Sequence, residues 1–420
     1  MAADLASSGA VPPAWAYTSA GRVIFGRGAV HSAGQLAAQA GGTAAGSMAL
    51  VCTDTVLAAA GLLDPVLASL RSSGLEVAVF DGGEPEVGRA TVEGAARMAS
   101  SKRPSLLIGL GGGSNIDLAK GVATLLAHGG DLDRYYGDSA VPGEILPVMA
   151  IPTTAGTGSE VSPVAVFADD ARRMKVGVSS AHLVPGWALL DPLLTVSCPP
   201  SVTAHSGMDA LSHAIEALCA LAYTDTEPDA SRSRAFCGKN PYSDTLAMEA
   251  VSLVGRSLIR AYRDGGDLQA REDMMLASLF AGLAFASAGT GLVHALQYPI
   301  GALTKTPHGL GNALLLPAVM RFNRPVRAAV LAQVGRRLPG QSASRPDEAA
   351  ADQAPSQVAE LAAALGIRGG LAALGVGAAD IAPLAADAAT VTRLIQLSPR
   401  PVTTADLEAV LRDALEPPAG

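Results

Sequence analysis

The chain has 420 residues, of which 49% are hydrophobic and 16% are charged, and its formal net charge is −8. An average soluble domain carries about 25% charged residues, so this chain has little surface charge for its length and ample apolar surface to bury. That composition excludes intrinsic disorder, and the excess of acidic residues argues against binding to nucleic acid or to an anionic membrane surface.

The first half of the chain alternates short β-branched runs with segments rich in Ala and Leu. This alternation predicts parallel strands joined by right-handed helical crossovers, with binding loops at the carboxyl ends of the strands. The expected strands are Met48–Cys52, Val77–Phe80, Leu106–Gly109 and Ile145–Ile151, and the expected helices include Val92–Ser100 and Ile116–His128.

From about Pro199 onward, apolar residues recur at spacings of three and four, and no strand pattern is visible. We therefore predict an α/β domain over residues 1–196 and an all-helical domain over residues 197–420. The expected helices are Met208–Leu221, Ser243–Tyr262, Glu272–Ala288, Ala328–Leu338 and Thr404–Leu415, with a polar loop at Gly340–Ser356.

Residues Met274–Thr304 contain no Asp, Glu, Lys or Arg, and this length would be enough to cross a bilayer. The stretch also contains serine, threonine, histidine, glutamine and proline, so we predict a buried helix of the core instead. The N-terminus lacks the basic and apolar regions of a signal peptide, and the four cysteines form no CxxC pair. These features favour a cytoplasmic protein with free thiols and no membrane partner.

A glycine-rich turn follows the strand that begins at Leu106. Gly109, Gly111 and Ser114 form a G-x-G-x-x-S pattern that leads into a helix, where free backbone N–H groups can hold a pyrophosphate. Asp54, at the end of an earlier strand, is the best candidate for the ribose hydroxyls, although a helix-capping role explains it equally well. A second loop, Pro152–Glu160, suits phosphate contacts but is by itself only a loop with capping residues.

Three histidines and one aspartate in the helical half form a candidate metal site. Asp209 and His213 stand at positions i and i+4 of one helix face, and His294 and His308 follow in apolar surroundings. One carboxylate with three imidazoles suits Fe²⁺, Zn²⁺, Co²⁺ or Ni²⁺. The alternative is that each histidine is a hydrogen-bonded core residue.

Taken together, these segments resemble the iron-containing (group III) alcohol dehydrogenase family, in matching order from about residue 20 to 415. The resemblance implies an N-terminal dinucleotide-binding domain with a parallel sheet, an all-helical metal-binding domain, the architecture shared with dehydroquinate synthase, and a site between the domains. The matching segments are Phe25–Gly28, Gly111–Lys120, Pro152–Glu160, Gly207–Ala217 and His294–Pro317.

The resemblance also assigns roles to individual residues. It implies Fe²⁺, with Zn²⁺ as the second choice, on Asp209, His213, His294 and His308, and NAD(H) on the glycine-rich loops, with NADP(H) still open. Lys175 matches a lysine near the cofactor, whereas the sequence alone would place it on the solvated surface. The implied cofactor-binding residues are Asp54, Gly111, Gly112, Gly113, Ser114, Asp117, Thr153, Thr154 and Thr157.

The chain departs from the family pattern in two places. Most members have a histidine near the nicotinamide where this chain has Tyr298, whose phenol, with an ordinary pKa near 10, is either a different proton relay or a packing residue. The segment between Ala222 and Asn240 is longer than usual, which is either a surface insertion or a similarity to hydroxyacid–oxoacid transhydrogenases.

We therefore expect a metal-dependent, NAD-linked alcohol dehydrogenase or aldehyde reductase that works on a small alcohol or aldehyde, as a homodimer. The alternatives are a transhydrogenase that retains its nicotinamide and a reductase of a small anionic aldehyde, such as a phosphonate or carboxylate, which Arg232 and Arg234 would bind. A non-catalytic metal or nucleotide sensor fits less well, because the full ligand set is present.

Overall fold

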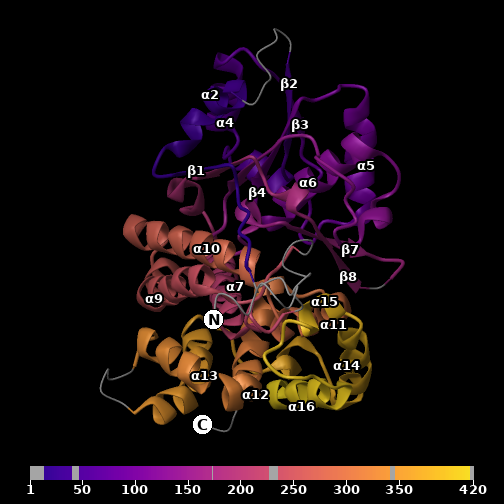
Figure 1. The fold of residues 1–420 in the computed structure, drawn as a ribbon. Helices are drawn as coiled ribbons and strands as arrows, with labels where there is room; N and C mark the ends of the chain where they lie inside the picture. Colours follow the sequence, from indigo (N-terminus) through magenta and orange to yellow (C-terminus); the bar gives the residue numbers. More distant parts are fainter. Residues whose placement is uncertain (1–13, 40–46, 173, 227–234, 341–345, 417–420) are drawn as a thin grey trace, which may run out of the picture.

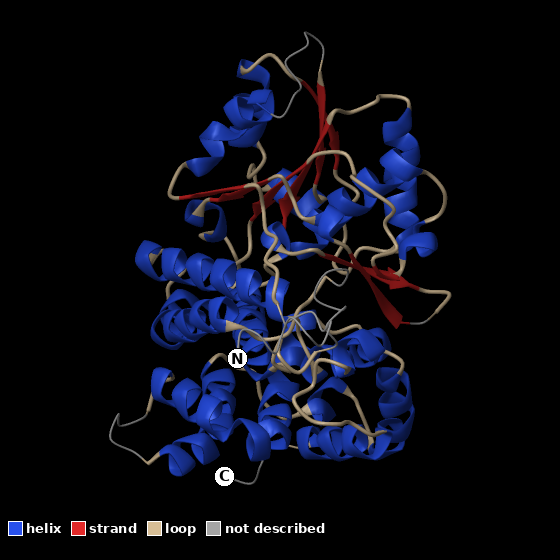
Figure 2. Cartoon of the chain, in the orientation of Figure 1, coloured by secondary structure: helices blue, strands red, loops and turns tan. Residues whose placement is uncertain are grey.

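The computed structural model describes residues 14–39, 47–172, 174–226, 235–340 and 346–416. Arg232, Arg234 and the centre of the insertion after Ala222 lie outside these described residues. An α/β region and a helical region stack on each other, with the strands confined to the first (Figure 2). This is the architecture that the sequence predicts.

The α/β region is built on a six-stranded sheet in the order β1-β9-β6-β4-β2-β3, in which every neighbouring pair is parallel. Successive residues of β2 pack on opposite faces, with Leu50 in one core cluster and Val51 in another, so helices cover both faces (Figure 1). The strands are β1 Arg22–Phe25, β2 Met48–Cys52, β3 Glu76–Phe80, β4 Leu106–Gly111, β6 Val148–Pro152 and β9 Trp187–Leu190.

Helices α5 and α6 contribute to one of these core clusters, and α2 and α4 to the other. The strand expected at Ile145 begins only at Val148, directly after Pro147, whose ring cannot donate to a ladder hydrogen bond. The helices are α2 Ala33–Gln39, α3 Thr55–Ala59, α4 Asp64–Ser72, α5 Arg89–Ser100 and α6 Gly113–His128, with short 3₁₀ turns at Ala29–Ser32, Leu132–Tyr135, Ser159–Val161, Ala181–Leu183 and Pro192–Thr195.

A second, three-stranded sheet lies between the main sheet and the helices (Figure 1). It consists of β5 Gly137–Asp138, β8 Met174–Ser179 and β7 Val164–Asp169, with β7 and β8 antiparallel. This sheet was not predicted from the sequence. The available signal was the short run Val164–Phe167, which contains two β-branched residues and an aromatic one. Strand β8 matters for function because it carries Lys175.

The helical region encloses the largest apolar core cluster. Helix α7 packs against α9, α10 and α12, so the helix that carries Asp209 and His213 is central to this core. The helices are α7 Pro200–Cys219, α9 Pro241–Arg263, α10 Leu268–Ala288, α11 Leu292–Thr304, α12 His308–Arg337, α13 Asp347–Ala364, α14 Ile381–Ala389, α15 Thr392–Ile395 and α16 Thr404–Leu415, with 3₁₀ turns at Leu371–Leu374 and Ala378–Asp380.

The prediction of a polar loop at Gly340–Ser356 is wrong, because α13 begins at Asp347. Its acidic residues face solvent, while Ala350, Ala354 and Val358 are buried in the helical core. The helix expected at Ala328–Leu338 is the last part of the longer α12, which has non-helical backbone angles at Arg327.

The prediction of one buried helix at Met274–Thr304 is also only partly right. Most of the segment is buried, with Leu303 exposed near its end, but it forms parts of two helices, α10 and α11, which meet at 105° around Gly289–Gly291. Among the described residues no single helix has both the length and the hydropathy of a membrane span, and only this bent pair meets both criteria together. The bend matters because His294 lies in the first turn of α11.

Candidate metal and cofactor site

A cavity lies where the carboxyl end of β4, the small sheet and the helical region meet. Clefts between domains and at the carboxyl ends of parallel strands are common places for cofactors and small molecules to bind. Its walls include the predicted metal ligands, part of the glycine-rich turn and two cations. The residues that line it include Gly113, Lys175, Asp209, His294, Tyr298 and Arg393.

Three separate helices bring the four predicted metal ligands together. Asp209 and His213 lie one turn apart on α7, His294 is in the first turn of α11, and His308 begins α12. The Asp209 Oδ1 atom is 3.8 Å from His294 Nε2 and 3.9 Å from His308 Nε2, and His213 Nε2 is 3.0 Å from His294 Nε2. Asp209, His294 and His308 therefore place ligand atoms within 4.8 Å of one another, and His213 stands beside this group through its contact with His294.

Hydrogen bonds at the far side of two imidazole rings orient them for metal binding. His213 Nδ1 is 3.2 Å from the carbonyl oxygen of Gly156, and His294 Nδ1 is 2.5 Å from Glu216 Oε2. An Nδ1–H that donates to such an acceptor leaves the Nε2 lone pair free for a cation. Burial lowers the pKa of His213 to about 4, so this ring is neutral at pH 7.

Burial also lowers the pKa of His308, with a further contribution from the nearby Lys175 charge. A neutral imidazole is the form that ligates metals. One carboxylate oxygen and three imidazole nitrogens in a buried site fit Fe²⁺ or Zn²⁺ well, and none of the described residues that line the cavity is a cysteine that would favour softer ions.

Two polar residues that contact the predicted ligands, Glu216 and Asn312, were not predicted from the sequence. Glu216 accepts a hydrogen bond from the backbone N–H of Val293 at 2.6 Å as well as contacting His294. It stands seven residues after Asp209, hence on the same face of α7, and this spacing was the signal that could have found it. Asn312, one turn after His308, places Nδ2 2.8 Å from Asp209 Oδ1 and 3.1 Å from His308 Nε2.

The glycine-rich turn has the strand-turn-helix geometry that a pyrophosphate site needs. Gly111 ends β4 with φ of +144°, a value that side-chain-bearing residues rarely adopt, and Gly112 is the N-cap of α6. The first N–H groups of α6 are therefore presented beside the cavity. Thr153 and Thr154 follow the neighbouring strand β6, and Thr157 packs against Gly113.

The two acidic residues assigned to the cofactor already accept hydrogen bonds within the protein. Asp54 caps α3 by accepting from the Leu57 N–H at 2.9 Å, and it also accepts from Asn115 Nδ2 at 2.7 Å. Asp117 is buried and accepts from Ser159 Oγ and from the Val166 N–H. Burial raises the pKa of Asp117 above its usual range. The capping role of Asp54 is thus present in the structure.

Lys175 is buried, with 5% of its surface exposed, which overturns the surface position that its sequence surroundings indicated. It lies on β8 and forms a 2.6 Å ion pair with Glu86. Tyr298, one turn after His294, is also buried and accepts a 2.8 Å hydrogen bond from Arg393 Nη2. Its ring centre is 6.5 Å from that of His308, which places the phenol beside the metal ligands.

Comparison with known proteins identifies the family. Residues 20–192 match the family described as iron-containing alcohol dehydrogenase, and residues 234–415 match the C-terminal part of the same family. The chain belongs to the iron-containing alcohol dehydrogenases. It is therefore an oxidoreductase that acts on CH–OH groups, and iron is the metal that gives the family its name.

Individual relatives cover nearly the whole chain. An NAD-dependent methanol dehydrogenase of Bacillus methanolicus is 34% identical over 93% of this chain and 97% of its own length. A 1,3-propanediol dehydrogenase of Klebsiella pneumoniae is 35% identical over 93% of this chain and 96% of its own length. The crystal structure of a 1,3-propanediol oxidoreductase superposes with a TM-score of 0.87 and 33% identity, over 96% of this chain and 100% of the other.

Proposed function

We propose that this iron-containing alcohol dehydrogenase interconverts a small alcohol and its aldehyde with NAD(H), and that Asp209, His213, His294 and His308 hold the metal. The observation that carries this assignment is the cluster of Asp209, His294 and His308, whose ligand atoms lie within 4.8 Å of one another, with His213 Nε2 3.0 Å from His294 Nε2, beside the turn at the start of α6. Metal and NAD(H) are the cofactors of this family's reaction, as the NAD-dependent relative from Bacillus methanolicus illustrates.

The residues of the α/β region bind and orient the cofactor. The N–H groups at the start of α6 hold the pyrophosphate, with Gly111, Gly112 and Gly113 allowing close approach of the backbone. Ser114, Asp117, Thr153, Thr154 and Thr157 surround this position, and Asp54 lies at the neighbouring strand end, where it would meet the adenosine ribose.

The residues of the helical region prepare the substrate end of the cavity. When bound, the divalent metal polarises the substrate oxygen as a Lewis acid. Glu216 and Gly156 fix the rings of His294 and His213, and the packed helices around them exclude water. Excluding water strengthens the electrostatic interactions in this part of the cavity.

Tyr298 is the candidate for moving the proton. Its oxygen accepts from Arg393, which leaves the phenol hydrogen free to point to another acceptor, such as the substrate oxygen. Burial raises its pKa above the ordinary value, so the phenol is protonated at neutral pH. Lys175, held by Glu86, contributes positive charge to the same cavity and repels a proton from His308.

The proposal also covers the domain boundary, the location and the oligomeric state of the protein. We place the domain boundary near residue 197, between the last strand and α7. We also propose a cytoplasmic homodimer that binds neither nucleic acid nor membranes, supported by the net charge of −8 and the free cysteines among the described residues.

The test is to replace His294 and His308 separately by alanine and to measure bound metal by mass spectrometry together with turnover. We expect loss of metal and at least a 100-fold fall in kcat/KM, because each change removes a ligand from a four-residue set. The control is His31→Ala, which removes an exposed histidine outside the cavity. Full activity and full metal content in both ligand variants would contradict the proposal.

A second assay separates the dehydrogenase from the transhydrogenase alternative. A dehydrogenase needs added NAD(H) for every turnover, whereas an enzyme that retains its nicotinamide would couple an alcohol donor to an oxoacid acceptor without any. We expect no turnover in that coupled assay.

A further inference from the structure

Arg393 is a cation of the site cavity that has no acidic partner within 4 Å among the described residues. Lys175, the other basic residue on the cavity wall, is paired with Glu86. The guanidinium of Arg393 instead donates to two hydroxyl groups, from Nη2 to Tyr298 Oη at 2.8 Å and from Nη1 to Ser179 Oγ at 3.3 Å. Neutral partners leave its positive charge unbalanced.

The acidic residues near the cavity contact groups other than Arg393, and Asp209 is one of the candidate metal ligands. Glu86 is paired with Lys175, and Asp117 accepts hydrogen bonds from Ser159 Oγ and the Val166 N–H. Glu216 contacts His294 on the far side of the metal ligands. No carboxylate among the described residues lies within 4 Å of Arg393, so its guanidinium can form an ion pair with a ligand.

The position of the guanidinium is built into the fold. It lies against the backbone of β8 at Gly177, where a Cβ atom would stand only 2.3 Å from Nη2. The centre of the Tyr298 ring is 5.9 Å from Cζ, so the ring lies beside the charge. Strand β8 and the helices α11 and α15 meet at this point (Figure 1). A cation held in place in this way loses little entropy when it binds a ligand.

Arg393 also stands close to the reaction centre. Tyr298 contacts Arg393 through its hydroxyl group, and its ring centre is 6.5 Å from that of the metal ligand His308. A substrate of a few carbon atoms whose oxygen is at the metal ligands would therefore extend its other end toward the guanidinium.

We propose that Arg393 binds an anionic group of the substrate, so that the preferred substrate is a short aldehyde or alcohol with a carboxylate, sulfonate or phosphonate at its far end. This inference rests on the proposed dehydrogenase function and names its substrate class. Arginine suits the role because its planar fork of N–H donors matches two oxygens of such a group.

The experiment compares matched substrates in the metal-loaded enzyme with NADH. Succinic semialdehyde and butanal have the same chain length and differ by the carboxylate. We expect kcat/KM to be about tenfold or more higher for succinic semialdehyde, and this ratio to fall about ten- to a hundredfold in Arg393→Gln, the effect of losing a charged hydrogen bond. Arg393→Lys should restore part of the ratio, because it keeps the charge without the fork.

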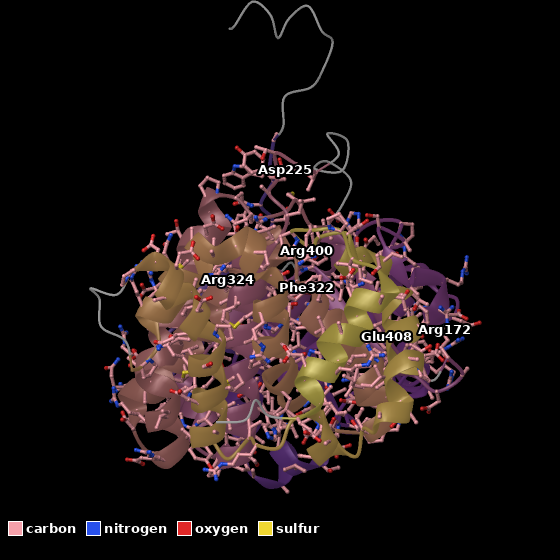
Figure 3. All side chains as sticks on the ribbon, turned by 90° about the horizontal axis from the view of Figure 1, so that it is seen from below. Arg172, Asp225, Phe322, Arg324, Arg400 and Glu408 are labelled. Carbon is pink, nitrogen blue, oxygen red and sulfur yellow. The ribbon has the colours of Figure 1, made fainter. Side chains whose placement is uncertain are left out.

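Two further variants make the test specific. Gly177→Ala should lower the ratio too, since it displaces the guanidinium without removing its charge. Arg400→Gln is the matched control: Arg400 lies 4.4 Å over the ring of Phe322 on the helical end of the molecule, outside the cavity (Figure 3), and should leave the ratio unchanged.

Sulfoacetaldehyde and phosphonoacetaldehyde, each measured against propanal, then identify the anion. Calorimetry measures the affinity of the NAD⁺-bound enzyme for 4-hydroxybutyrate. This affinity should fall in Arg393→Gln together with the ratio of kcat/KM values.

The outcomes are distinguishable. A substrate ratio that Arg393→Gln leaves unchanged would overturn the inference while the dehydrogenase function stands. If Arg393→Gln instead raised the KM for NADH equally with both aldehydes, the inference would also be overturned, because Arg393 would then bind the cofactor. If the metal-loaded wild type reduces none of these aldehydes and oxidises none of the corresponding alcohols, the proposed function itself fails.

Discussion

Glu216 Oε2 lies 2.5 Å from His294 Nδ1, which joins a carboxylate on α7 to a metal-ligand imidazole on α11. The other oxygen of Glu216 accepts the Val293 N–H, one of the backbone donors that the start of α11 leaves without a helical partner. One buried side chain thus fixes both the ring orientation of His294 and the start of the helix that carries it.

Replacing Glu216 by glutamine should weaken metal binding by about 10- to 100-fold, because a neutral amide supports the His294 imidazole less well than a carboxylate. The measurement is competition with a chelator of known affinity, which does not depend on activity. Glu249→Gln, on the exposed face of α9, is the control and should bind metal normally. Unchanged metal affinity in Glu216→Gln would show that the contact is only structural.

Replacing Gly112 by alanine should raise the KM for NAD(H) about tenfold while the protein stays folded. The backbone of Gly112 has φ of −69°, which alanine tolerates, and the new Cβ would meet Thr154 only at 3.6 Å. A methyl group there would intrude on the pyrophosphate at the start of α6. Steady-state kinetics and the melting temperature check this, with Gly94→Ala on α5 as the control. An unchanged KM would place the pyrophosphate elsewhere.

Replacing Tyr298 by phenylalanine should lower kcat about 10- to 100-fold without loss of metal, because the change removes a proton donor but no ligand. Metal analysis and the pH dependence of kcat separate this role from packing, since a packing residue would leave the pH profile unchanged. Tyr262→Phe is the control, because that hydroxyl lies near Gly366 in the helical core. If kcat stays at the wild-type level, the proton moves by another route.

Replacing Glu160 by glutamine should remove a pH-dependent loss of stability. Burial raises the pKa of Glu160 from its ordinary 4.5 to about 7. Between pH 4.5 and about pH 7 the folded state therefore binds more protons than the unfolded state. The stabilising contribution of this carboxyl is fully present below about pH 4.5 and is lost as the pH rises through 7.

The difference in the free energy of unfolding between wild type and Glu160→Gln should therefore change by about 1 to 3 kcal/mol between pH 4.5 and pH 8. Urea unfolding of the metal-stripped proteins at both pH values measures it. The control is Glu76→Gln, at an exposed position of β3, whose free energy of unfolding should show the same pH dependence as that of the wild type. A Glu160→Gln curve parallel to the wild-type curve would contradict the expectation.

Most of the fold could be predicted because its patterns are local. The strands around Leu50 and Ile108 are short β-branched runs bounded by turns, and buried parallel strands have that appearance in any sequence. Glycine at position 111 follows from the conformation that the turn requires. Conversely, α13 was missed because its exposed face is polar and Pro355 interrupts its sequence, while the apolar contacts that stabilise it come from α12.

For the site, the kinds of ligand and the i, i+4 pairing of Asp209 with His213 could be predicted from the sequence, because one helix sets that geometry. The approach of His294 and His308 to Asp209 depends on how the helices pack, since the bend between α10 and α11 directs the first turn of α11 toward α7. The contacts of Arg393 with Tyr298 and Ser179 likewise depend on packing between residues far apart in the chain. Local spacing carries no information about such contacts, because they form only when separate helices and strands pack together.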